Sequence, residues 1–213
     1  PGDEVLVVFE APVDEDEYYI YYGNPNAKPP QEYEPKRGLM LETRRRASGD
    51  PNTWKDMQDI LKRSTFVYGR GYVEKVFDGY NRFGPVEDYI SIYKGWVMAP
   101  KTGTYTFCTA SDDASFMFIN GKMVCKWPGY HSATAGAWGK FSGTIYLEKG
   151  VHEFEYYHLQ ANSQSACVAG WKQPGMEEED VALVPDWAFP GLARATVKHQ
   201  QERNAPFSVD YRL

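Results

Sequence analysis

Two adjacent carboxylates, Asp112 and Asp113, are the side chains of this 213-residue chain that most clearly suggest chemistry. They follow a strand-like run that begins at Gly103 and precede a second run that turns at Asn120 and Gly121. Neighbouring carboxylates repel each other and lose hydration on burial, so solvent, hydrogen-bond donors or a cation must offset that cost. Calcium prefers oxygen ligands of this kind, and the pair is therefore a candidate metal site. The alternative is a turn in which both side chains cap nearby backbone groups.

The sequence contains no complete catalytic motif of the kinds considered below. His152 and Glu153 begin like a zinc-protease motif, but the position of the second histidine is Tyr156 and the segment alternates with a period of two. The acidic run 14–17 lacks the glycine and the final glutamate of an EF-hand loop, which favours a solvated turn. A nucleophile elbow and a phosphate-binding loop are also missing from the sequence. We therefore predict that the chain is not an enzyme.

Charge and hydropathy exclude further classes. The formal net charge is −6, which argues against a nucleic-acid partner because phosphate contacts need clustered Lys and Arg. The basic run 44–46 is interpreted as a solvated turn or as a local salt-bridge partner. No run of 18 apolar residues occurs, so we expect no direct membrane insertion.

The three cysteines, Cys108, Cys125 and Cys167, allow at most one intramolecular disulfide. No two of them have the spacing of a redox or zinc motif. Cys108 and Cys125 lie on neighbouring strand-like segments and could pair. We expect instead that all three are unpaired strand residues.

The elements that must position these side chains are mostly strands. Aromatic residues make up 15% of the chain, and such side chains suit half-buried pleated surfaces. Asn120-Gly121 between apolar runs predicts a hairpin, and the alternation over 151–159 predicts an antiparallel strand. One helix is expected at 53–62, where apolar residues recur at helical spacing and Thr53 with Asp56 approaches a capping box.

The domain organisation follows from these runs. Residues 1–36 are expected to form an N-terminal β-hairpin, with strands at 4–9 and 18–22, or the tail of a preceding domain. Residues 37–65 are expected to be a linker with one helix, and 66–190 the main β domain. Residues 191–213 contain strand-like runs that we expect to lead to a further domain.

An ordered set of motifs across 66–190 resembles the PA-fourteen domain, a β module first described in a bacterial toxin's protective antigen. The motifs are G-T-Y-T-F-x-x-x-S-D-D-x-S-F-x-x-I-N-G-x-x-V, an aromatic and Gly-rich loop, G-T-I-Y-L-E-K-G-V-H-E-F-E-Y, and A-G-W at 169–171. The module also occurs in yeast flocculins and adhesins, in bacterial surface proteins and in glycosidases. The resemblance implies an all-β fold, an antiparallel β-sandwich or barrel-like domain.

The same resemblance implies a function for the Asp pair. In lectin-like members, two consecutive Asp joined by a cis peptide bind one calcium ion, which holds the hydroxyls of a sugar. Adjacent side chains of an extended strand point to opposite faces, and a cis bond could turn both towards one ion. Asn162 is the matching candidate for a third calcium ligand. Gln160 or Gln164 could substitute for it, and both are also candidate sugar contacts.

The loop 126–138 supplies the remaining candidates, because exposed aromatic rings stack on sugar rings. The carbohydrate-binding candidates of this loop are Trp127, Tyr130, His131 and Trp138. The two Trp residues could equally belong to the core, and His131 could be a loop hydrogen-bonder. The expected hairpin places this loop beside the Asp pair, and the strand 151–159 carries the loop 160–164 to its far end.

We therefore predict a non-enzymatic, calcium-dependent carbohydrate-binding module, lectin-like or adhesive, of a larger extracellular or cell-surface protein. Calcium is the expected cofactor and a glycan the expected partner. The alternative is a structural or assembly β module with no sugar ligand, whose partners are neighbouring domains or subunits.

Overall fold

The computed structural model describes residues 38–133, 139–177 and 180–190 in full, together with Asn26 and the backbone of three short strands. The chain divides into two compact units, one of residues 37–190 and one formed by 1–36 and 191–213. The larger unit carries all the predicted site residues.

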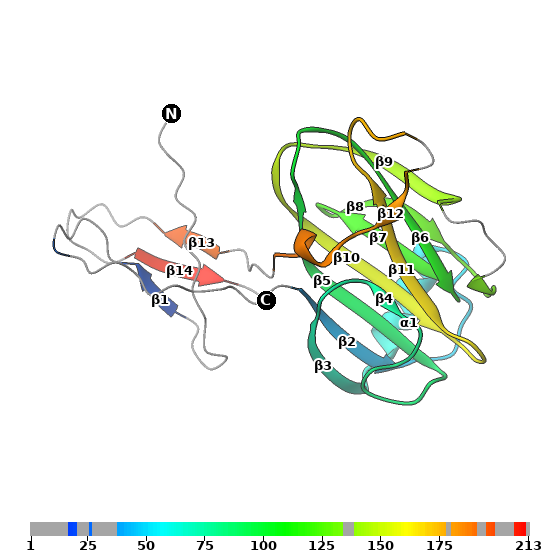
Figure 1. Cartoon of the computed structure of the whole chain (residues 1–213). Helices are drawn as coiled ribbons and strands as arrows, with labels where there is room; N and C mark the ends of the chain where they lie inside the picture. The colour runs from blue at the N-terminus through cyan, green and yellow to red at the C-terminus, as the bar shows by residue number, and fades with distance from the viewer. Residues whose placement is uncertain are drawn as a thin grey trace. The chain divides into compact units, whose positions relative to one another are not determined.

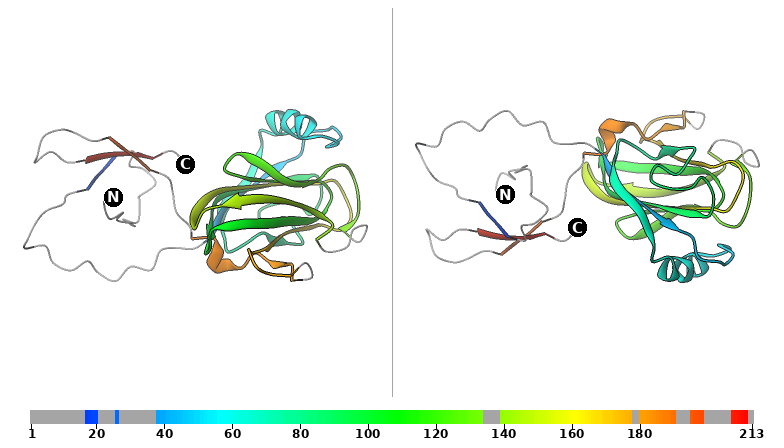
Figure 2. Two further views of the ribbon diagram at one scale, coloured as in Figure 1. Left: turned by 90° about the horizontal axis from the view of Figure 1, so that it is seen from above. Right: turned by 90° about the horizontal axis from the view of Figure 1, so that it is seen from below.

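Two antiparallel sheets form the larger unit (Figures 1 and 2). The six-stranded sheet has the order β3-β2-β5-β10-β7-β8. Its strands are β3 (Val67–Val73), β2 (Leu39–Arg45), β5 (Tyr89–Ala99), β10 (Gly150–Gln160), β7 (Ser115–Ile119) and β8 (Lys122–Trp127). In the other sheet the order is β12-β11-β6-β9, and β4 also pairs with β11. These strands are β12 (Ala182–Leu183), β11 (Ala166–Lys172), β6 (Gly103–Asp112), β9 (Phe141–Leu147) and β4 (Phe77–Asp78).

The predicted all-β class is confirmed, and the form is a sandwich. Within the described residues the two sheets remain separate, because the edge strands β8 and β9 each pair with one neighbour only. The hairpin turns at Asn120 and Gly121, both with positive φ, between β7 and β8 as predicted.

The main core lies between the sheets. Large side chains with essentially no solvent exposure fill it, including Leu39, Tyr105, Phe107, Phe154 and Phe189. Burying such side chains is the principal stabilising contribution to a fold of this kind.

Helix α1 (Trp54–Arg63) covers the outer face of the six-stranded sheet. Thr53 is its N-cap, and the Thr53 hydroxyl accepts a hydrogen bond from the backbone N–H of Asp56, as the predicted capping box requires. Met57 and Ile60 are buried against sheet residues that include Ile90, Phe116 and Leu159. The predicted helix at 53–62 is confirmed, and a short 3₁₀ turn spans Asp186–Ala188.

The segment expected to be a linker differs from that expectation. Within 37–65, β2 pairs with β3 on one side and with β5 on the other. Its first residues, Leu39 and Leu41, are buried in the main core. The sequence obscured this strand because its second half is the polar run Glu42-Thr-Arg-Arg45, and the arginines at 44–46 suggested a solvated turn.

The smaller unit contains a three-stranded sheet of β1 (Glu17–Ile20), β14 (Phe207–Tyr211) and β13 (Ala195–Lys198). β14 pairs with both other strands, so segments from opposite ends of the sequence share one sheet. The expected strand at 4–9 lies outside the described residues.

All three cysteines are buried and unpaired, on β6, β8 and β11, as expected.

Candidate functional site

The Asp pair lies at the end of β6, where the chain crosses from one sheet to the other. β6 ends at Asp112, and β7 begins at Ser115 after a turn of two residues. The peptide bond between Asp112 and Asp113 is cis. Both side chains are largely buried, with exposed fractions of 9% and 7%. Bulk water therefore hydrates these two carboxylates only weakly.

The Asp113 carboxylate connects two loops. One oxygen, Oδ1, accepts a hydrogen bond of 3.0 Å from the backbone N–H of His131, and Oδ2 accepts one of 2.9 Å from the backbone N–H of Ala161. The described part of the 126–138 loop and the start of the 160–164 loop thus meet at the Asp pair. The predicted convergence of these segments is present, and a single side chain joins them.

Asp112 has a different environment. Burial raises the pKa of its carboxyl, the nearby charge of Asp113 raises it further, and a hydrogen bond from the backbone of Ala133 opposes the rise. The Asp112 main-chain carbonyl accepts a hydrogen bond of 2.8 Å from Nε2 of His158. His158 has no solvent exposure, and burial lowers the pKa of its imidazole to about 4. A neutral ring with its proton on Nε2 therefore holds the backbone of the pair at neutral pH.

Gln160 shapes the second loop from inside. Its side chain is fully buried, and Nε2 donates hydrogen bonds of 2.8 Å to the carbonyls of both Asn162 and Gln164. The other end of the amide, Oε1, is buried without a partner among the described residues. Asn162 and Gln164 themselves are exposed. Gln160 thus holds the loop backbone, whereas a sugar-contacting side chain would need access to solvent.

The aromatic candidates fall into three groups. Trp127 is only 6% exposed and is stacked between His131 and Phe141, with ring centroids 3.8 and 4.0 Å apart. Tyr130 is 46% exposed, and its hydroxyl donates to the carbonyl of Gly49 at 2.7 Å. Trp138 lies outside the described residues. Trp127 therefore has a core environment, whereas Tyr130 is the more exposed of the described Trp and Tyr candidates and has the Arg46 guanidinium 5.8 Å from the centre of its ring.

His131 connects the aromatic stack with the Asp pair. Its backbone N–H donates to Asp113, and its half-buried ring lies on Trp127. Burial lowers the pKa of the imidazole, and both carboxylates oppose that effect. Its Nδ1 atom is buried and without a partner among the described residues.

Two residues at this site were not identified from the sequence. His158 supports Asp112, and Arg46 donates a hydrogen bond of 2.8 Å from Nη1 to the Tyr130 hydroxyl. The alternating pattern of 151–159 had indicated that His158 shares a face with Phe154 and Tyr156, but its partner lies 46 residues away. The basic run 44–46 was visible as well, although its contact with the 126–138 loop was not.

The oxygen donors at the Asp pair suit a hard metal ion better than a soft one. The described residues contain no group of three or more His, Cys, Asp or Glu side chains that could hold a metal. An ion here would therefore take two carboxylates and complete its shell with amide or main-chain oxygens. The buried and unpartnered Oε1 of Gln160 belongs to that class of donor. Calcium prefers such a set, and a softer metal does not.

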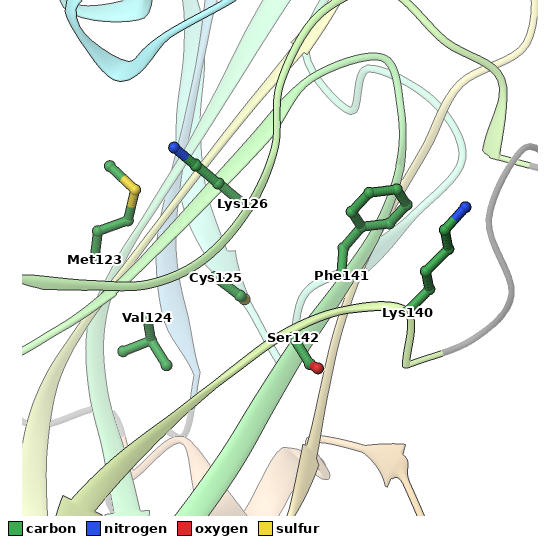
Figure 3. A pocket seen from close by; sticks show the side chains of 7 residues that line it. All are labelled: Met123, Val124, Cys125, Lys126, Lys140, Phe141 and Ser142. Carbon is green, nitrogen blue, oxygen red and sulfur yellow. The ribbon is translucent and has the colours of Figure 1, made fainter.

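A wider hollow in the described part of the chain lies away from the Asp pair. It occupies about 360 Å³ between the edge strands β8 and β9, and Figure 3 shows the side chains around it. Its lining residues are Met123, Val124, Cys125, Lys126, Lys140, Phe141 and Ser142. The Asp pair does not line this hollow, although Phe141 connects the two regions through its stack on Trp127.

Comparison with known proteins identifies the class that this fold and site define. The family model of the PA14 domain, the PA-fourteen module, matches residues 77–184. That match covers half of the sequence, and the chain belongs to the PA14 domain family. No curated protein sequence shows a significant match.

Solved structures share the fold at low sequence identity. A PA14 sugar-binding domain from an RTX adhesin is 15% identical with a TM-score of 0.56, and the match covers 72% of this chain and 98% of that domain. The epithelial adhesin 6 A domain of Candida glabrata, solved in complex with Galβ1-3GlcNAc, is 12% identical with a TM-score of 0.56, covering 79% and 90%.

A third similar structure belongs to a different kind of protein. An anti-sigma factor domain-containing protein from Clostridium clariflavum is 14% identical with a TM-score of 0.54. The match covers 72% of this chain but only 47% of that protein, so the chain spans about half its length. At these identities the likeness to all three structures establishes the fold alone. No helix in the described residues is long and apolar enough to cross a bilayer.

Proposed function

We propose that this domain is a non-enzymatic, calcium-dependent carbohydrate-binding module of a larger extracellular or cell-surface protein. The observation that carries the proposal is the arrangement at Asp113, a buried carboxylate that joins two loops beside a second buried carboxylate. Family membership adds weight, because solved PA14-like structures include sugar-binding adhesin domains.

Electrostatics support a cation at the pair. No Lys, Arg or His side chain forms an ion pair with Asp112 or Asp113 among the described residues, and the donors they receive are main-chain N–H groups. The raised pKa of Asp112 reflects first the burial of its carboxyl and then the nearby charge of Asp113, so a charge at this position is unfavourable. A bound divalent cation would make the charge of Asp112 favourable, because it would attract both carboxylates. Asp112, Asp113, Asn162 and main-chain oxygens of the 160–164 loop would hold it.

The sugar would then lie on the outside of the ion, between the two loops. Tyr130 and Gln164 are the exposed candidates that could contact it. Trp127 would act indirectly, by fixing His131 through the aromatic stack. This assignment replaces a direct sugar contact by Trp127 with a supporting role.

A titration of the full chain tests the proposal. Calcium binding is measured by calorimetry, and glycan binding on an array with calcium and then with chelator. We expect Asp112→Asn to lose both activities, because it removes a charged ligand of the proposed calcium ion. Asp112 is preferred to Asp113 for this test because Asp113 also holds the two loops. Asp59→Asn on the exposed face of α1 removes the same charge and serves as the matched control. Calcium-independent glycan binding, or a folded domain that binds neither calcium nor glycan, would contradict the proposal.

A structural module without a sugar ligand is the second candidate. One observation favours it: both oxygens of Asp113 already accept main-chain hydrogen bonds, so the residue can hold the loops with no metal present. In that case calcium would leave the melting temperature unchanged, while Asp113→Ala would lower it.

A further inference from the structure

A small basic pocket lies where β2 ends and where the chain leaves α1. It occupies about 120 Å³. Its lining residues are Arg45, Arg46, Ala47, Arg63, Thr65 and Phe66. Three of these six side chains are guanidinium groups, in a chain whose formal net charge is −6. The pocket is therefore opposite in charge to the chain as a whole.

Among the described residues, a carboxylate partner is present for one of the three arginines. Arg46 forms an ion pair with Asp88, with Nη2 at 3.0 Å from Oδ1. Arg63 donates to two main-chain carbonyls, those of Asp59 at 3.2 Å and Ser48 at 2.7 Å, which carry no formal charge. The guanidinium of Arg45 lies 5.7 Å from the centre of the Phe66 ring.

No described carboxylate lies within ion-pair distance of Arg45 or Arg63. The pocket thus presents about two uncompensated positive charges. Guanidinium groups bind planar or tetrahedral oxyanions through paired N–H donors, and such charge-assisted bonds are stronger than neutral ones. The residue types therefore select a carboxylate or sulfate group over a neutral hydroxyl.

The size of the pocket limits what can enter. Its volume is well below the roughly 300–1,000 Å³ of sites that enclose a drug-sized ligand. That space suits one oxyanion substituent, with the rest of the ligand outside. A ligand that binds here must therefore extend over the neighbouring surface.

That neighbouring surface leads to the Asp pair. Arg46 donates to the Tyr130 hydroxyl, and the next residue, His131, donates its backbone N–H to Asp113. On the other side the backbone N–H of Asp88, the ion-pair partner of Arg46, donates to the carbonyl of Ala161 at 2.8 Å. Arg46 thus contacts, directly or through one residue, both loops that meet at Asp113.

We propose that the pocket formed by Arg45, Arg46 and Arg63 binds a carboxylate or sulfate substituent of the glycan, so that the module selects acidic over neutral sugars. That the rest of the ligand is a glycan rests on the proposed function above. Binding of the oxyanion in the pocket does not rest on it.

The test compares three oligosaccharides of equal length: a neutral galactose oligomer, its sulfate ester and an oligogalacturonate. Calorimetry measures their affinities for the full chain with calcium, and inorganic sulfate is titrated separately in chelator. We expect one or both acidic oligomers to bind about tenfold more tightly than the neutral one, the gain of a single charge-assisted contact. Whichever acidic oligomer gains identifies the source of the oxyanion.

The variant Arg45→Gln/Arg63→Gln should lose this preference and keep its affinity for the neutral oligomer. Its matched control is Lys55→Gln/Lys62→Gln on α1, which removes the same charge from side chains that are 83% and 76% exposed. Because Arg63 also holds the Ser48 backbone, Arg45→Gln alone is measured as well. Among the described residues the Arg45 side chain contacts the Phe66 ring and has no polar partner, so this change should leave the fold intact and reduce the preference.

The outcomes separate the two proposals. Equal affinity for acidic and neutral oligomers overturns the pocket and leaves the proposed function standing. Sulfate binding that depends on Arg45 and Arg63, without any glycan binding, retains the pocket and overturns the function. An equal loss in the lysine control shows a general charge effect and overturns the pocket. The selectivity for acidic glycans is also overturned if a single-stranded RNA binds as tightly as the acidic oligomers and with the same dependence on Arg45 and Arg63.

Discussion

The two ends of the sandwich interior have opposite chemistry although the same strands build both. On β10, Phe154 and Gln160 both face inward with no solvent exposure. Phe154 packs on Phe189, with ring centroids 5.1 Å apart, and both belong to the main hydrophobic core. The inward positions near Gln160 are instead polar: Ser91, Thr109, Ser111, Ser115 and His158 are all at most 3% exposed.

The polar end is organised by hydrogen bonds. The Ser115 hydroxyl lies 2.8 Å from those of Thr109 and Ser111, and Thr109 also contacts the Tyr156 hydroxyl at 2.7 Å. Apolar packing at this end comes mainly from outside, where α1 covers Ile90 and Leu159. Apolar side-chain packing at one end of the interior is therefore the main source of stability. At the other end, where the candidate site lies, hydrogen bonds between buried polar side chains take the place of that packing.

The largest effect is expected at the apolar end. Phe154→Ala should lower the free energy of unfolding by about 3–5 kcal/mol, the range for removing a buried aromatic ring. Urea denaturation measures it, with Val151→Ala on the same strand as the control, where a 38% exposed side chain should matter by less than about 0.5 kcal/mol. A loss below about 1 kcal/mol for Phe154→Ala would remove the distinction between the two ends.

Acid should destabilise the polar end through His158. Its pKa is about 4 when folded and near 6.5 when unfolded, so the unfolded state binds more protons between these values. Stability contributed by this group is complete above pH 6.5 and falls as the pH drops towards 4. At about 1.36 kcal/mol per pH unit the loss is about 3 kcal/mol.

The measurement is urea denaturation from pH 7.5 to 4 in chelator, for the native chain and for His158→Gln. The variant retains a donor at this position but cannot titrate. Its pH dependence should be shallower by about 3 kcal/mol over the interval. Identical slopes would show that another group controls the acid transition.

The two aspartates should differ in chelator. Asp113→Ala removes two hydrogen bonds between a carboxylate and main-chain N–H groups, and should cost about 2 kcal/mol. Asp112→Ala should cost less, because the raised pKa of Asp112 shows that its charge is already unfavourable. Thermal unfolding of both variants compares them, and a larger loss for Asp112→Ala would reverse the assigned roles.

The smallest effect concerns the external support of the polar end. Thr53→Ala removes the N-cap of α1 and should cost about 1 kcal/mol. Hydrogen exchange should then increase at Leu159 and Ala161 more than at Phe154, because the helix covers the former end. Thr53→Ser retains a capping hydroxyl and should restore protection. Uniform acceleration along β10 would mean that the helix supports the whole sandwich.

Much of the fold could be predicted because its signals are local. The Asn120-Gly121 turn, the alternating strand at 151–159 and the capped helix after Thr53 each depend on neighbouring residues, and each appears as expected. β2 could not be recognised from the sequence, because its polar second half lacks a local strand pattern. Its pairing with β3 and β5 is visible only in the folded structure. Its polar half, with Glu42 between Arg44 and Arg70, becomes intelligible only when β3 is beside it.

The candidate site was predictable in position and less so in the role of each residue. The order of elements brought Asp113, His131 and Ala161 to one end. Burial then decided roles that the residue types had left open. Trp127 is enclosed by two rings and Gln160 faces inward, so neither has the access to solvent that a sugar contact requires.

The sequence by itself determined the family, the antiparallel β class and the presence of a carboxylate pair between strands, because these depend on residue types at fixed spacing. The tertiary structure alone decided which groups meet that pair. Burial and hydrogen-bond partners are properties of surfaces brought together from distant segments, as where Asp113 meets the backbones of residues 18 and 48 positions further along the chain. For the same reason Arg63, which is distant in the sequence from Arg45 and Arg46, shares one pocket with them only in the folded chain.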